Sequence, residues 1–241
     1  MKPHSALALL SLAAGLGFAG CSHSPAADAE PRELRYVVFL RRNPARLPMH
    51  QSIREAIMKA HMANIQRMAD EGVLLAAGPM EDKEETIEGI FVLKATSQEK
   101  ARRIAAQDPT VLGNRNTIDV HPWLAPAGIG AAYFRRVKEG PAAKVAMASH
   151  AFCLVLRGPA WPGASRPDAA HERFVGSLRA AGTLAAAGPV EDDPDLLGII
   201  IFRGSSTDEA RKALDQDPAV RSGRISIEYH LWWTADGILP W

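Results

Sequence analysis

Residues 74–82 read LLAAGPMED and residues 184–192 read LAAAGPVED, so the chain carries nearly the same stretch twice. Each copy is a short apolar segment that ends in a Gly-Pro turn and an acidic pair. An internal repeat defines the unit of folding and therefore has to be identified before single elements are assigned. Here the repeating unit is about 90 residues long and occurs twice.

The repeat extends to polar residues. His61 stands seventeen positions before the first Gly-Pro turn, as His171 does before the second. Asp108 and Asp217 both occur in a Gln-Asp-Pro context, and each precedes another histidine by thirteen positions. A duplicated scaffold needs only its apolar pattern to be preserved. The matched histidines and aspartates therefore indicate a role beyond folding.

Both copies have the order of elements βαββαβ. Short β-rich or alternating apolar runs predict strands, and apolar residues at helical spacing predict the first helix of each copy. Capping boxes predict where the second helices begin, at Thr96-x-x-Glu99 and Ser206-x-x-Glu209. The predicted elements of the first copy are 34–40, 49–71, 73–77, 87–93, 96–107 and 117–121. Those of the second are 151–156, 167–181, 183–187, 197–202, 206–215 and 225–231.

This order predicts an α+β fold of two tandem ferredoxin-like domains, at residues 34–125 and 149–234. Each four-stranded antiparallel sheet would carry both helices on one face and leave the other face open. Two copies in one chain can cover each other, so we expect an intrachain dimeric α+β barrel, a monomeric pseudo-dimer. Residues 126–148, rich in Ala, Gly and Pro, read as a linker with room for a short helix, and residues 235–241 as a C-terminal tail.

The composition is that of an ordinary globular protein. The 241 residues are 47% hydrophobic, with a formal net charge of +1 and no long run of Lys or Arg. This length supports two modest cores, and the charge argues against nucleic acid or an anionic membrane surface as a partner. Cys153 lies in the apolar run 151–156 and is expected to be a buried, inert thiol.

The first twenty residues differ from the rest of the chain. An apolar run at 6–19, too short for an ordinary transmembrane helix, predicts a signal peptide at 1–20. The segment Phe18-Ala19-Gly20-Cys21 resembles the lipobox of bacterial lipoproteins, with Phe18 where that motif usually has Leu. It implies lipidation at Cys21, a flexible tether at 21–33, and a place on the periplasmic face of an envelope membrane, held only by the lipid anchor. The alternative is an ordinary secreted protein with a free Cys21.

The repeated motifs resemble those of the YCII-related family over residues 34–125 and 149–234. The resemblance implies a fold like that of muconolactone isomerase and a His and Asp proposed as a catalytic dyad. Most members have unknown substrates, and a dehydrochlorinase that acts on a chlorinated hydroxyquinol is among them. The motifs are the two helical histidines, Ala77-Gly78-Pro79 and Ala187-Gly188-Pro189, Gly89 and Gly198, the Gln-Asp-Pro segments, and His121-Pro122-Trp123 with His230-Leu231-Trp232.

Carried over by position, the dyads are His61 with Asp108 and His171 with Asp217. A neutral imidazole can take or give a proton near neutral pH, and a carboxylate on its other nitrogen fixes the tautomer. Alternatively, each Asp simply caps a short helix that begins at the following proline. The recurrence of both residue types favours the dyads, and a capping role is compatible with them.

Other pairs recur at matched positions. Arg115 and Arg224 stand seven residues after the Asp and could clamp a substrate carboxylate, or could simply be exposed. His121 and His230 share strand faces with Asp119 and Glu228, but no short HxH or ExxH spacing supports a metal site, and none is predicted. The acidic pairs Glu81-Asp82 and Glu191-Asp192 read as solvated loop charges, or else as the rim of a site.

Two functions remain open at this stage. The first is a small-molecule enzyme, a lyase or isomerase, that removes a proton or eliminates a leaving group through the His-Asp dyads. The sequence contains neither a Gly-rich phosphate loop nor a Cys/His cluster. We therefore expect neither an organic cofactor nor a structural zinc. The alternative is a non-catalytic envelope lipoprotein that binds a ligand or serves as an assembly module.

Overall fold

The computed structural model describes residues 31–81, 86–140, 146–163 and 169–241. The predicted signal peptide, Cys21 and most of the tether lie outside these ranges. The first half contains β1 (Arg32–Arg42), α1 (Gln51–Asp70), β2 (Leu74–Pro79), β3 (Ile87–Leu93), α2 (Gln98–Ala105), α3 (Pro109–Leu112) and β4 (Asn116–Pro126). The second contains β5 (Met147–Arg157), α5 (Ala169–Ala180), β6 (Leu184–Pro189), β7 (Leu196–Phe202), α6 (Thr207–Leu214), α7 (Pro218–Arg221) and β8 (Ile225–Ala235).

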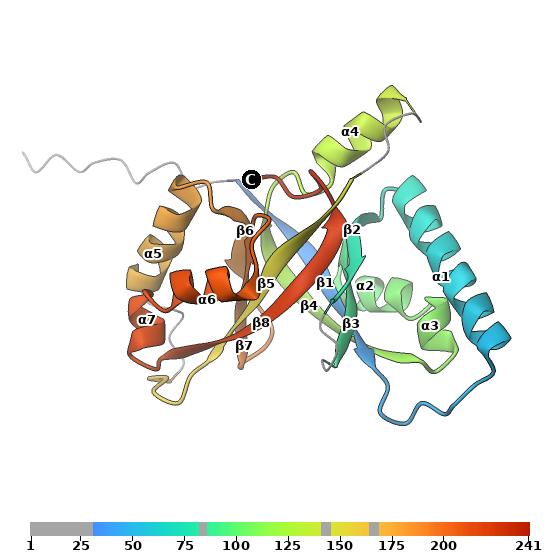
Figure 1. Ribbon diagram of the computed structural model, residues 1–241, viewed down its shortest axis with the longest axis horizontal. Coiled ribbons are helices and arrows are strands. Elements are labelled where there is room, and N and C mark those ends of the chain that lie inside the picture. Colours follow the sequence, from blue (N-terminus) through green and yellow to red (C-terminus); the bar gives the residue numbers. More distant parts are fainter. Residues whose placement is uncertain (1–30, 82–85, 141–145, 164–168) are drawn as a thin grey trace, which may run out of the picture.

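Each half is a four-stranded antiparallel sheet, with strand orders β2-β3-β1-β4 and β6-β7-β5-β8. The predicted ferredoxin-like order is confirmed, with one additional short helix, α3 or α7, before the last strand of each half. Figure 1 shows the helices on the two outer sides of the molecule and the strands crossing in the middle. The inner faces of the sheets are therefore turned toward each other.

The two sheets share one core. The Phe152 ring packs edge-on against Phe39 of the first half at 6.4 Å between centroids, and against Trp232 at 5.8 Å. The sheet edges also meet, because Met80 pairs with Trp232 and Trp123 with Val190 in isolated antiparallel bridges. These contacts bury the open faces that a single ferredoxin-like sheet would leave in water. The fold is the expected dimeric α+β barrel within one chain.

The Gly-Pro segments were expected to be turns, but they form the last residues of β2 and β6, and they lie where the halves meet. The Trp232 indole N–H donates to the carbonyl of Gly78 at 3.2 Å, and Trp123 donates to Gly188 at 3.1 Å. A Cβ on Gly78 would lie 2.0 Å from the carbonyl oxygen of Trp233. Only glycine permits so close an approach of two backbones. The repeated Ala-Gly-Pro motif therefore belongs to the seam, by which we mean the contacts between β2 and β8 and between β4 and β6.

One predicted capping box is wrong. The helix α2 begins one residue later than expected, and its N-cap is Ser97, whose hydroxyl accepts from the Lys100 N–H at 3.1 Å. Thr96 and Ser97 are both acceptable cap residues, and the structure uses the second. In α6 the predicted box is confirmed, because Ser206 and Glu209 satisfy each other's backbone N–H groups.

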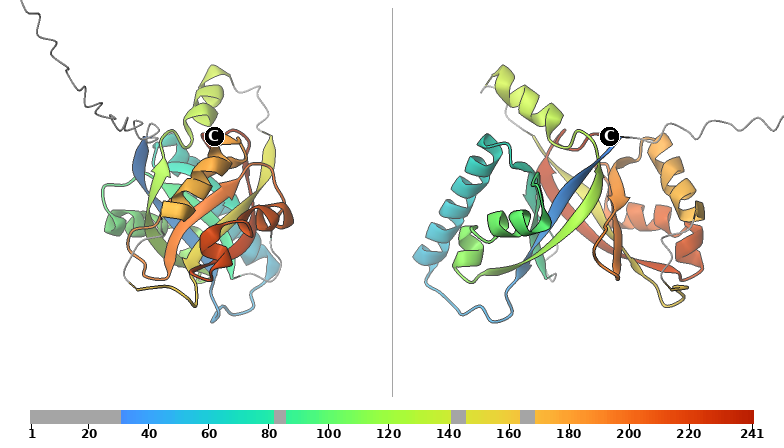
Figure 2. Two further views of the ribbon diagram at one scale, coloured as in Figure 1. Left: turned by 90° about the vertical axis from the view of Figure 1, so that its left-hand side faces the viewer. Right: turned by 180° about the vertical axis from the view of Figure 1, so that it is seen from behind.

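The described parts of the predicted linker and tail contain further structural elements. The strands β4 and β8 extend to Pro126 and Ala235, and Ile238 lies buried in the shared core. Between the halves, α4 (Ala131–Glu139) projects from the body of the molecule (Figure 2). Within the described ranges, no helix is both long enough and apolar enough to span a membrane.

Candidate functional site

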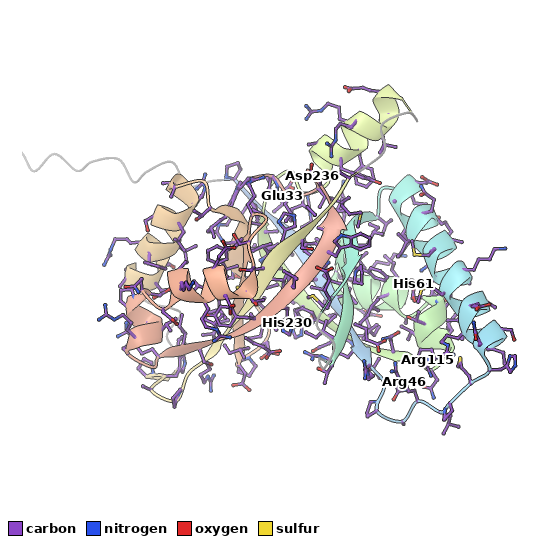
Figure 3. The ribbon with its side chains drawn as sticks, in the orientation of Figure 1. Glu33, Arg46, His61, Arg115, His230 and Asp236 are labelled. Carbon is purple, nitrogen blue, oxygen red and sulfur yellow. The ribbon has the colours of Figure 1, made fainter. Side chains whose placement is uncertain are left out.

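The His61–Asp108 pair joins the long helix α1 to the start of α3. Nδ1 of His61 lies 2.9 Å from Oδ1 and 2.8 Å from Oδ2 of Asp108. An ionised carboxylate only accepts hydrogen bonds, so the ring donates through Nδ1 and its lone pair resides on Nε2 in the neutral form. The imidazole also stacks on Phe91 of β3, with 5.9 Å between centroids and 21° between planes. Figure 3 shows His61 on the side of α1 that faces the first sheet.

The carboxylate of Asp108 is fully buried and fully hydrogen-bonded. It accepts from the Thr110 N–H at 2.9 Å, from the Thr110 hydroxyl at 2.6 Å and from the Asn64 amide at 3.0 Å. Burial alone would raise the pKa of Asp108, but hydrogen bonds from His61, Thr110 and Asn64 outweigh it and hold the pKa below its ordinary value. Asp108 therefore stays ionised opposite His61. Its bond to the Thr110 N–H also makes it the N-cap of α3, so both proposed roles coexist.

The second half repeats this contact. Nδ1 of His171 lies 2.6 Å from Oδ2 of Asp217, and Asp217 caps α7 through the Ala219 N–H at 2.8 Å. Asp217 has no solvent exposure. The structure thus brings together each histidine and aspartate that the resemblance to the YCII-related family pairs. Their catalytic role remains a prediction.

Access to the dyads is narrow. The His61 side chain keeps 13% of its surface exposed and the His171 side chain 10%. Among the described residues, none hydrogen-bonds Nε2 of His61, which leaves this nitrogen for solvent or a ligand. Two cavities of about 190 Å³ each lie elsewhere, and neither is lined by a residue of the dyads.

Among the contacts of the described residues, none joins either arginine side chain to a dyad residue. Arg115 lines one of these cavities, beside Leu47 and Met49, and its guanidinium donates to the Leu47 carbonyl at 3.1 Å. Figure 3 shows Arg115 near Arg46, beyond the end of the sheet and away from His61. Arg224 lies in the turn before β8, where its N–H donates to the Ala219 carbonyl. A clamp for a substrate carboxylate remains a prediction for both.

His121 is held between two carboxylates. Nε2 lies 2.9 Å from Oδ1 of Asp119 on the same strand, and Nδ1 lies 3.1 Å from Oδ1 of Asp192 in the loop of the other half. Burial alone would lower the pKa of His121, but the hydrogen bonds and charges of these two carboxylates outweigh it and raise the pKa. Through Asp192, His121 therefore connects the first half to a loop of the second half across the seam.

The acidic pairs after the Gly-Pro segments contribute to this seam. Asp192 also accepts from the Gln98 amide, and Glu81 accepts from the Ser149 hydroxyl at 2.6 Å. Glu81, Glu191 and Asp192 are exposed, as expected of solvated loop charges, and Glu81 and Asp192 in addition contact the other half. The sequence signal was the recurrence of Glu-Asp one residue beyond Gly-Pro, although nothing local identifies the partner. Asp82 lies outside the described residues.

The second cavity opens at the same seam. Both halves line this cavity, with polar or charged side chains and three leucines. The lining residues are Arg41, Asp119, His121, Leu154, Leu156, Asp193, Asp195, Leu196 and Glu228. Glu228 of this group also contacts His230, at 2.8 Å through Nε2 of the ring. Among the described residues, neither His121 nor His230 shares a hydrogen-bond partner with a dyad. Among the described residues, no three His, Cys, Asp or Glu side chains are arranged to hold a metal ion.

Comparison with known structures supports the barrel. A mutant of chlorite dismutase from Candidatus Nitrospira defluvii is similar to this chain with a TM-score of 0.54 and 12% identity, over 85% of this chain and 92% of that one. A provisionally described chlorite dismutase has a TM-score of 0.52 and 6% identity, over 85% of this chain and 94% of that one. At such identities the likeness shows the fold alone. No curated protein matches the sequence.

The family is established by the sequence profile of the YCII-related domain, which matches residues 34–124 and 163–232. The first match spans the first half of the barrel and the second covers the second half after β5, and each contains one His-Asp pair. Most of the chain is therefore covered, and the chain belongs to the YCII-related domain family.

Proposed function

We propose that the protein is a small-molecule enzyme that uses no organic cofactor and removes a proton from carbon, with His61 as the general base. The observation that carries the proposal is the contact of the partly exposed His61 ring with the buried Asp108 carboxylate at 2.8 Å, repeated by His171 and Asp217. A fold shared with chlorite dismutase-like proteins is compatible with an enzyme of this kind.

The proposed chemistry follows from the geometry of the pair. Because Nδ1 donates to Asp108, Nε2 of His61 presents the lone pair that accepts a proton from an acidic C–H group. The C–H electron pair then either forms a double bond while a β leaving group such as chloride departs with its electrons, or shifts an existing double bond that is reprotonated. The carboxylate at 2.8 Å stabilises the imidazolium formed. A base placed in this way accelerates a reaction by roughly 10²–10⁴-fold.

The alternative is a non-catalytic envelope module in which the pair is structural. Asp108 ties α1 to α3 and caps α3, and these contacts would be sufficient reason for its burial. The two readings differ in what the loss of a histidine does. A structural pair would be needed for folding, whereas a catalytic pair would be needed only for turnover.

The test uses proton exchange at carbon, because the substrate is unidentified. The protein is incubated in D2O with lactones and a chlorinated hydroxyquinol, and deuterium incorporation and chloride release are followed by NMR and ion chromatography. Wild type should catalyse one of these reactions, and His61→Ala with His171→Ala should abolish it without loss of the fold. The matched control is His50→Asn. It replaces an exposed histidine at the N-cap of α1 by asparagine, which can also cap the helix.

Two results would contradict the acid–base role. Full activity in the double variant would show that the dyads take no part in the reaction. Unfolding of either single variant, measured by circular dichroism, would favour the structural reading instead.

We also propose that the chain is exported and anchored by a lipid at Cys21. The support is the apolar run at 6–19 followed by Gly20-Cys21. A fatty-acid probe supplied to cells should label wild type and should not label Cys21→Ser. Equal labelling of the two would disprove the assignment.

A further inference from the structure

The two dyads differ in how firmly the carboxylate is held. Asp108 accepts hydrogen bonds from His61, from Asn64, and from both the N–H and the hydroxyl of Thr110. An ionised carboxylate offers about four acceptor positions, so those of Asp108 are all occupied. Its orientation is thus determined from two sides, by α1 and by α3.

Asp217 accepts from fewer donors. Within the described residues its partners are the His171 ring at 2.6 Å and the Ala219 N–H at 2.8 Å. The sequence explains the difference. The position three residues after the histidine is Asn64 in the first half and Phe174 in the second, and the position two residues after the aspartate is Thr110 in the first and Ala219 in the second.

The histidine rings differ as well. His61 stacks on Phe91, whereas the corresponding position in the second half, two residues after the strand glycine, is Ile200. An aromatic face restrains the tilt of a stacked ring, and an aliphatic side chain does so less. Both aspartates are equally buried, at 0% exposure, so burial does not account for the asymmetry.

We propose that Asn64 and Thr110 are positioning residues that hold the Asp108 carboxylate, and that they make His61–Asp108 the preorganised and working dyad, while the carboxylate of Asp217 in the second pair is held by fewer hydrogen bonds. This inference rests on the acid–base role proposed above. Preorganisation matters because a base that must first be oriented loses much of the advantage of proximity.

The decisive experiment measures the positioning without a substrate. In the full chain with ¹⁵N-labelled histidine, NMR gives the hydrogen-exchange rate of the Nδ1 proton of each ring. The His61 proton should exchange about tenfold more slowly than the His171 proton, because opening must break additional hydrogen bonds. The double variant Asn64→Leu with Thr110→Val removes both side-chain donors at nearly constant shape and should bring His61 to the rate of His171.

Matched variants separate positioning from packing. Thr110→Ser keeps the hydroxyl and should leave the slow exchange of His61 intact, whereas Thr110→Val alone should accelerate it. Ala219→Ser introduces a donor beside Asp217 and should slow the exchange of His171. Equal exchange of the two rings in wild type, or an unchanged rate in the double variant, would overturn the proposal whatever the activity.

Turnover tests the second part of the inference. In the carbon-exchange assay, His61→Ala should cost far more activity than His171→Ala, and the Asn64→Leu with Thr110→Val variant should lower kcat more than it changes KM. Equal losses in the two histidine variants would overturn the ranking of the dyads. If wild type catalyses none of the reactions while His61 exchanges slowly, the proposed function fails and the positioning role of Asn64 and Thr110 stands.

Discussion

Single residues in this protein combine roles that the sequence presents as alternatives. Asp108 is the N-cap of a short helix and at the same time the partner of His61, because a carboxylate has two oxygens and several acceptor positions. Asp217 combines the same two roles. A cap and a dyad therefore do not compete for the residue. The motif Gln-Asp-Pro positions the carboxylate through the cap, and α1 or α5 supplies the histidine.

Cys153 provides a residue-scale prediction. Burial raises the pKa of its thiol to about 12, and the nearby Arg211 charge opposes this only in part. In a Cys21→Ser background, iodoacetamide at pH 8 should therefore label Cys153 slowly in the native protein and rapidly in urea, because the thiolate is the reactive form. Mass spectrometry measures both rates. Equal rates with and without urea would show that the thiol is accessible in the fold.

At the scale of elements, the Gly-Pro segments that end β2 and β6 connect the two halves. Each Gly-Pro segment continues its strand across the seam, where a tryptophan of the other half donates to the glycine carbonyl. The helices contribute less to this contact, since they cover the outer faces of the sheets (Figure 2). The motif that identifies the repeat in the sequence is therefore also the one that closes the barrel.

Two glycine substitutions test this function of the segments. Gly78→Ala would place a Cβ 2.0 Å from the Trp233 carbonyl oxygen and should lower the free energy of unfolding by about 2–3 kcal/mol. Gly176→Ala, in the exposed part of α5 with no atom within 4 Å of the new Cβ, should raise it by about 0.5–1 kcal/mol. Urea unfolding gives both values. A Gly78→Ala protein as stable as wild type would mean that the seam is looser than the structure shows.

At the scale of the whole molecule, the two halves are connected by charge as well as by the apolar core. His121 of the first half bridges Asp119 and Asp192, and the groups that surround it include Arg41 and Glu228, which line the same cavity. The pKa of Asp119 is lowered mainly by the hydrogen bond from His121, and burial only partly opposes this. The bridge is therefore complete while the carboxylates are ionised and the imidazole is protonated.

The bridge predicts a pH dependence of stability. Because the pKa of His121 is raised on folding, its contribution is fully present below the unfolded value of 6.5 and is lost as pH rises through the folded pKa. The contribution also declines in acid, as pH falls through the lowered pKa of Asp119. His121→Gln should therefore destabilise the protein by about 1–2 kcal/mol near pH 5.5 and by less near pH 9.

Urea unfolding at pH 5.5, 7 and 9 measures this difference. The control is again His50→Asn, which replaces an exposed histidine whose ring hydrogen-bonds Ser52 at the start of its own helix. A destabilisation by His121→Gln that is constant over the whole range would show that packing, and not the charge bridge, is what the substitution removes.

The pairing of each histidine with its aspartate was implied by the resemblance to the YCII-related family, whereas the sequence by itself determined the repeat and the order of strands and helices. These features are readable because apolar periodicity and duplicated spacing are properties of the chain in linear order. The choice of Ser97 over Thr96 as a cap was not readable, since both residues can cap a helix and packing selects between them.

Only the tertiary structure decided the contacts across the seam and the exposure of each site. His121 meets Asp192, 71 residues away, because two separate sheets close into one barrel. The narrow access to His61 and the placement of Arg115 at a different cavity likewise depend on how α1 and the loops pack. Local patterns specify the elements, whereas contacts between distant segments are determined by which surfaces the folded chain removes from water.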